Sequence, residues 1–173
     1  MDFKKINNLT GWAVTLIACT VYLLTMEASG SFWDCGEFIS SAYKLQIPHP
    51  PGAPMFVLLG RVFIIFFGDN PQTAALAVNS MSALASGFTI LFLFWTITHF
   101  AKRMVETGKE VALTTQQIIL IMGAGIIGAL GYTFSDTAWY SAVEGEVYAL
   151  SSFFTALVFW AILKWEHKAD QPG

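Results

Sequence analysis

Two acidic residues and a histidine lie close together in the segment FWDCGEFISSAYKLQIPHPPGAP, residues 32–54. Asp34 and Glu37 are spaced i, i+3, so both carboxylates share one face if residues 33–44 form a helix. A carboxylate in such a place can act as a general base on a hydroxyl or amide. It can also bind a metal ion, or simply keep a helix face solvated. The spacing alone leaves all three roles open.

His49 lies in a proline-rich turn, Pro48-His49-Pro50-Pro51-Gly52. Proline fixes φ and biases the residue before it toward extended geometry, and glycine allows the chain to reverse. The turn is either a stiff connector or a rigid support that presents the His49 imidazole to a polar headgroup. His49 is therefore a candidate substrate-binding residue.

A second acidic segment, FSDTAWYSAVEGEVYAL, covers residues 134–150. Aromatic residues at a membrane edge usually anchor the chain at the interface. A mixture of aromatic residues and carboxylates is also typical of sugar binding, because the rings cover apolar sugar faces while the carboxylates accept hydroxyl hydrogens. The candidate substrate-binding residues here are Trp139, Glu144, Glu146 and Tyr148, and we expect Glu146 to reach a cavity rather than solvent.

Several other functions find no support in the sequence. It contains no phosphate-binding glycine pattern, zinc-ligand spacing or nucleophile elbow. The three histidines fall in separate regions, so we expect no histidine-held metal; a requirement for a divalent metal stays open. No basic stripe indicates nucleic-acid binding. The two cysteines, Cys19 and Cys35, are expected to be free thiols.

The composition is that of a membrane protein. The chain is 55% hydrophobic and 12% charged, whereas soluble domains average about 25% charged residues. About 20 apolar residues are needed to cross a bilayer as a helix, and the segments 9–26, 72–100, 111–135 and 147–163 carry no charge. We therefore predict one all-α polytopic domain over 1–173, with spans at about 9–26, 73–99, 114–135 and 147–165 and outer loops at 27–71 and 136–146.

The apolar segment 53–68 is ambiguous. As a helix it would be only about 24 Å long, and Arg61 at its centre would cost at least ~2.5 kcal/mol in mid-bilayer. With four spans, seven of the nine basic residues face the cytoplasm, and the acidic residues of both outer loops face outward. The positive-inside rule thus favours four spans, a cytoplasmic N-terminus, and juxtamembrane helices in the first outer loop.

The arrangement resembles the GT-C glycosyltransferases, and most closely the protein O-mannosyltransferases. Those proteins carry an Asp-Glu-x-x-Phe motif after the first helix and a His-Pro-Pro-Leu-Gly-Lys turn before a juxtamembrane segment. The matching residues read Asp34-Cys-Gly-Glu37-Phe38 and His49-Pro50-Pro51-Gly52. The chain is still more similar to a bacterial membrane family, long described only as a domain of unknown function, whose vertebrate relative resembles a secretory-pathway O-mannosyltransferase. WDCGEFI, HPPGAP and the pattern from Trp139 to Leu150 carry this likeness.

The resemblance implies an inverting transfer of a sugar from a polyprenyl-phosphate donor, held among membrane lipids, to Ser or Thr of an exported protein. Asp34 would take the proton from the acceptor hydroxyl. Glu37 would support it, because the second acid is displaced here by Cys35 and Gly36. The lysine of the turn is absent, which leaves Arg61 as the candidate for the leaving phosphate. No further cofactor is implied.

The resemblance also implies a longer parent with more spans, of which this chain would be the N-terminal portion, inactive alone, in a bacterial inner membrane with periplasmic acidic loops. Two other classes stay open. Asp136, Glu144 and Glu146 could line the cation path of an ion-coupled transporter, although transporters place such residues inside spans. The chain could also be a non-catalytic membrane subunit.

Overall fold

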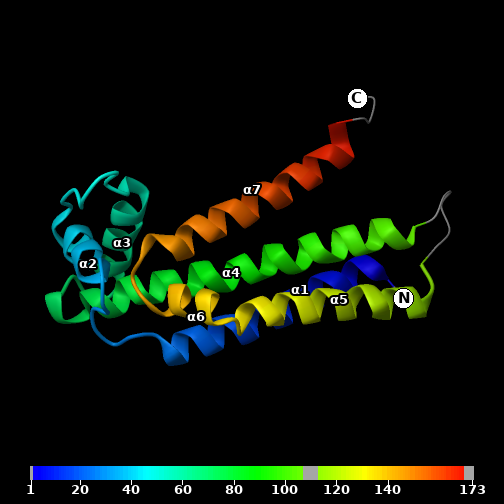
Figure 1. The fold of residues 1–173 in the computed structure, drawn as a ribbon, viewed down its shortest axis with the longest axis horizontal. Coiled ribbons are helices and arrows are strands. Elements are labelled where there is room, and N and C mark those ends of the chain that lie inside the picture. The colour runs from blue at the N-terminus through cyan, green and yellow to red at the C-terminus, as the bar shows by residue number, and fades with distance from the viewer. Residues whose placement is uncertain (1, 107–112, 170–173) are drawn as a thin grey trace.

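The computed structural model describes residues 2–106 and 113–169, which form seven α-helices and no strand (Figure 1). The helices long and apolar enough to cross a membrane are α1 (Phe3–Thr25), α4 (Pro71–Val105), α5 (Thr115–Thr133) and α7 (Val147–Ala169). The shorter helices are α2 (Cys35–Lys44), α3 (Pro54–Phe66) and α6 (Asp136–Val143). The prediction of an all-α membrane chain with four spans and short helices in the first outer loop is confirmed.

Helix α4 is the axis of the molecule. It has 35 residues, so it is about 52 Å long, well beyond a ~30 Å hydrocarbon core. The Asn70 side chain caps its start by accepting from the backbone N–H of Gln72, and Lys102 and Arg103 lie in its last turn, where cations suit the helix dipole. Every other helix packs against it, as Figure 1 shows.

Small residues allow α1 and α5 to approach α4 closely. A Cβ added at Gly87 of α4 would collide with Cys19 of α1, and one at Gly128 of α5 would lie 2.6 Å from Cδ1 of Ile97. The Tyr22 hydroxyl also donates to the carbonyl oxygen of Thr133, at 2.8 Å. Large apolar side chains on the opposite faces of these helices are exposed, which suits contact with lipid.

Helices α2 and α3 are attached to the N-terminal part of α4. Phe38 of α2 and Phe56 of α3 pack in one buried cluster with Val78 of α4, and the two phenylalanine rings meet edge to face at 5.4 Å. This cluster holds the acidic segment and the proline turn at one end of the molecule.

The structure adds detail that the sequence analysis did not contain. Helix α2 begins at Cys35, so Asp34 precedes its first turn rather than lying within it. The outer loop 136–146, for which no secondary structure was predicted, contains helix α6. Lys109, one of the basic residues assigned to the cytoplasm, lies outside the described residues.

Candidate functional site

Asp34 is placed by an unusual backbone. The preceding residue, Trp33, has a left-handed φ of 58°, which strains a bulky residue, and its side chain is almost fully exposed. Asp34 occupies the N-cap position of α2, yet its carboxylate makes no capping hydrogen bond. Its oxygens are therefore left to face outward, with the side chain 53% exposed.

The proline turn brings His49 to the same place, a contact that the sequence did not predict. The backbone N–H of His49 donates to Oε1 of Glu37 at 2.7 Å, and its Nδ1 lies 2.9 Å from Oε2 of the same carboxylate. Nε2 of the imidazole lies 3.9 Å from Oδ2 of Asp34. The imidazole therefore stands between two carboxylates, with its ring tilted against Phe38 at 5.7 Å.

The contacts between His49 and Glu37 shift the pKa of both residues. The side-chain hydrogen bond to Glu37 raises the pKa of His49, and the charges of Glu37 and Asp34 raise it further. The same hydrogen bond, with the one from the His49 backbone, lowers the pKa of Glu37. Both shifts favour the charged pair of imidazolium and carboxylate, and Asp34 makes only the longer contact.

Asp34, Glu37 and His49 are also the residues that could hold a metal ion. One ligand atom from each lies within 4.8 Å of the others, and imidazole with carboxylates is a ligand set used for divalent transition metals. The cluster contains one histidine, and the prediction that histidines hold no metal stays a prediction.

The second acidic segment docks directly against the first. The backbone N–H of Glu27 donates to the carbonyl oxygen of Val143 at 2.9 Å. The Nδ2 of Asn79 donates to the carbonyl oxygens of Glu27 and Ser29 at 2.8 and 3.1 Å. Gly145 fits here because an added Cβ would lie 2.9 Å from Oδ1 of Asn79. The two outer segments therefore form one structural unit.

Glu146 lies in this junction and is buried, 7% exposed; it is shielded from solvent, but it lines none of the described cavities. Burial raises the pKa of its carboxyl, and the charges of Glu144 and Asp34 raise it further; a hydrogen bond from the Asp34 backbone lowers it. Glu146 therefore contacts the backbone of Asp34.

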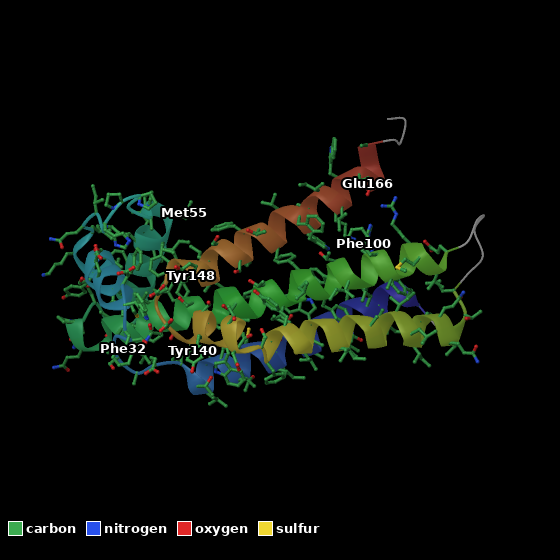
Figure 2. The ribbon with its side chains drawn as sticks, in the orientation of Figure 1. Phe32, Met55, Phe100, Tyr140, Tyr148 and Glu166 are labelled. Atoms are coloured by element: carbon green, nitrogen blue, oxygen red, sulfur yellow. The ribbon has the colours of Figure 1, made fainter. Side chains whose placement is uncertain are left out.

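A cavity of about 600 Å³ opens between the two outer segments. Trp139, Tyr140 and Phe32 supply aromatic walls, and Glu27, Asp136 and Glu144 supply carboxylates. Figure 2 shows Phe32 and Tyr140 at the same end of the molecule as Met55 and Tyr148, away from Phe100 and Glu166. The volume of the cavity is within the usual range for small-ligand sites, and its lining is the aromatic and carboxylate mixture anticipated for a sugar.

Two predicted site residues lie elsewhere. Arg61 binds Asp69 through two hydrogen bonds of 2.6 and 3.0 Å and donates to the carbonyl oxygen of Tyr43, so its guanidinium already has a carboxylate partner. Tyr148 is exposed and lines a different cavity, with Tyr22 and Tyr132. The structure brings neither to the cavity that Trp139 and Glu144 line.

Asn79 is the residue that sequence reasoning missed. It is fully buried in α4 and fastens the first outer loop, yet it lies in a segment treated as plain packing helix. A lone carboxamide in a long uncharged run was the available signal, since polar side chains in membrane helices face protein rather than lipid.

These features define an integral membrane protein with an acidic, aromatic site at one end of its helical bundle. The sequence profile of the family described as Protein O-mannosyl-transferase TMEM260 N-terminal domain matches residues 34–173. The chain belongs to this family, and the predicted resemblance to O-mannosyltransferase-like membrane proteins is confirmed.

Two curated relatives show the same likeness. The chain is 26% identical over 159 residues to "Protein O-mannosyl-transferase tmem260" of Dictyostelium discoideum, covering 90% of this chain and 17% of the relative. It is 27% identical over 154 residues to the Mus musculus protein of that name, covering 89% and 19% respectively. The chain thus spans less than a fifth of either relative. No solved structure matches it significantly.

Proposed function

We propose that this chain supplies the acidic site of a glycosyltransferase that moves a sugar, mannose in the named relatives, onto protein hydroxyl groups. The observation that carries the proposal is the grouping of Asp34, Glu37 and His49 on the first outer loop. Family membership supports it, because the curated relatives are named as protein O-mannosyl-transferases.

The geometry supports a base role for Asp34. Its carboxylate is exposed, lacks a capping bond, and can accept the proton of a Ser or Thr hydroxyl as the bond to the sugar forms. The hydroxyl oxygen attacks the anomeric carbon, the bond from that carbon to the phosphate oxygen breaks, and the lipid phosphate leaves with inversion. Glu37 is a positioning residue, because it holds His49 beside Asp34 through two hydrogen bonds.

We assign the donor as a polyprenyl-phosphate sugar and the acceptor as an exported protein. The apolar helix surfaces next to the site suit a lipid-linked donor, and the aromatic cavity between the outer segments suits the sugar or its acceptor. Arg61 as the phosphate partner has less support, because Asp69 occupies its guanidinium.

We also place the chain in a bacterial inner membrane with its N-terminus in the cytoplasm and the acidic loops in the periplasm. The charge distribution supports this orientation, since the start of α1, which carries Lys4 and Lys5, and the end of α4, which carries Lys102 and Arg103, lie at the end of the molecule opposite the site (Figure 1). Labelling of single cysteines at residues 5 and 32 with a membrane-impermeant thiol reagent tests it, in a background where Cys19 and Cys35 are replaced by Ala. Labelling at residue 5 alone in intact cells would contradict it.

The test of the function is Asp34→Asn in the complete reading frame. We expect transfer of mannose to exported proteins to fall by about 10²- to 10⁴-fold, the usual contribution of a general base, while the amount of membrane-inserted protein is unchanged. Glu106→Gln, at the opposite end of α4, removes the same charge and should retain activity. Unchanged transfer in the Asp34→Asn protein would refute the base role.

A further inference from the structure

A second cavity, of about 520 Å³, lies at the end of the bundle opposite the acidic site. Helices α1, α4 and α7 enclose it with their residues 3–12, 95–102 and 160–164. The proposed glycosyl transfer does not use it. Its size is again within the usual range for small-ligand sites.

The mouth of this cavity is basic. Each of the three helices contributes one lysine to the lining: Lys4, Lys102 and Lys164. Lys102 pairs with Glu106 at 3.2 Å. Lys4 and Lys164 form no salt bridge with the described residues. No carboxylate among the described residues lines the cavity. The cavity therefore favours an anion.

The deeper wall of the cavity is aromatic. On each of the three helices a lysine lies near the helix end and a tryptophan lies further along the helix, toward the middle of the bundle. Trp12 lies about 12 Å along α1 from Lys4, Trp95 about 10 Å along α4 from Lys102, and Trp160 about 6 Å along α7 from Lys164. The indoles of Trp95 and Trp160 lie 5.2 Å apart, and that of Trp12 meets Trp95 edge to face at 6.4 Å. Indole rings gather at the boundary between headgroups and acyl chains, so this order matches the profile of one lipid leaflet.

The wall also contains buried polar atoms that lack a partner among the described residues. These are the amide oxygen of Asn7 on α1 and the indole N–H of Trp95 on α4. Buried polar atoms are rarely left without a partner, and both residues line the cavity. The cavity lining is therefore polar as well as aromatic.

We propose that this cavity binds the phosphate headgroup of an anionic glycerophospholipid. The ammonium groups of Lys4 and Lys164 donate hydrogen bonds to the phosphate oxygens, and the acyl chains follow the aromatic wall into the bilayer. Basic pockets between membrane helices are known to hold such headgroups. A free phosphate would use the lysines but not the tryptophans, so the ordered aromatic wall favours the lipid.

Native mass spectrometry of the purified chain tests the proposal. The probes are phosphatidylglycerol and phosphatidylcholine with identical acyl chains. We expect phosphatidylglycerol to be retained in preference to phosphatidylcholine. The double substitution Lys4→Gln with Lys164→Gln should weaken phosphatidylglycerol binding by roughly thirtyfold, the effect expected for two basic groups near anionic lipid.

The matched control is Lys5→Gln with Lys44→Gln. This control removes the same amount of charge. Lys5 is next to Lys4 in the sequence, Lys44 lies in α2 at the other end of the molecule, and neither lysine lines the cavity. The control should bind phosphatidylglycerol as the unmodified chain does. An equal loss in both double variants would refute the site, because it would indicate general attraction to an anionic surface.

Two further measurements need no substitution. Phosphatidylglycerol with brominated acyl chains should quench tryptophan emission more strongly than brominated phosphatidylcholine, and equal quenching would overturn the proposal. Inorganic phosphate at millimolar concentration should not displace the lipid. Full displacement would identify a phosphate site and refute the lipid assignment.

Discussion

His49 is held by Glu37 through both its backbone and its side chain, at 2.7 and 2.9 Å from the two oxygens of one carboxylate. This double contact closes the proline turn against α2 and leaves Nε2 directed toward Asp34. The turn and the helix thus act as one support for the proposed base.

The first prediction concerns pH. The raised pKa of His49 stabilises the fold at pH values below its ordinary 6.5, and this contribution is lost as pH rises through the raised value. The lowered pKa of Glu37 stabilises the fold at pH values above its ordinary 4.5. This contribution is lost as pH falls through the lowered value. Both contributions are complete between pH 4.5 and 6.5. The melting temperature of the chain relative to its His49→Gln variant should therefore be greatest there. A pH-independent difference would contradict the pair.

The second prediction concerns Glu146. Because burial raises its pKa, the folded state binds a proton more tightly than the unfolded state. The free energy of unfolding is therefore lowered most at pH values above the raised pKa. It recovers as pH falls from the raised pKa to the ordinary value. Glu146→Gln should raise the melting temperature at pH 8 and change it little at pH 4. Glu27→Gln is the control, since that residue is exposed and its charge is not among the causes of the raised pKa of Glu146. An equal effect in that variant would argue against a role for burial.

The third prediction tests the amide of Asn79. Asn79→Ala removes two part-buried hydrogen bonds to the first outer loop, each worth about 0.5–1.5 kcal/mol. Chemical denaturation should show that loss, and proteolysis near residues 27–33 should accelerate. Ser82→Ala in the same helix deletes a buried hydroxyl without a described partner and should be nearly neutral. The idea fails if the two variants are equally stable.

The fourth prediction tests the fit of Gly145. A Cβ there would lie 2.9 Å from both Oδ1 of Asn79 and Cγ1 of Val78, so Gly145→Ala should cost about 1–3 kcal/mol through overpacking. Gly36→Ala in α2 meets nothing within 4 Å and should be tolerated. Thermal melting of the two proteins compares them directly. Equal melting temperatures would show that the second acidic segment is not packed tightly against α4.

The four spans could be predicted because long uncharged stretches have few alternatives once charge is this sparse. Helix α3 could also be anticipated as a short juxtamembrane helix, because the segment 53–68 is too short to span and carries Arg61. Helix α6 could not, because its polar residues at a membrane edge look like those of a loop and it has only eight residues.

The contacts within the site were beyond sequence reasoning for a different reason. The partner of Glu37 is twelve residues away across a turn, and that of Asn79 is about fifty residues away. The periodicity of the sequence does not indicate such contacts, since they depend on how α2 and the outer loops pack against α4. Arg61 illustrates the point: a cation without a close partner in the predicted helix is bound by Asp69, after the helix has ended.

The length of α4 has one more consequence. About twenty of its residues suffice to cross the hydrocarbon core, so the remainder forms a stiff post of roughly 20 Å. Because α2 and α3 are attached to the N-terminal part of α4, the carboxylate proposed as the base has a set height relative to the lipid surface. Under the proposed transfer, the thickness of the surrounding bilayer, rather than the length of any loop, selects which stretches of an acceptor polypeptide come within its reach.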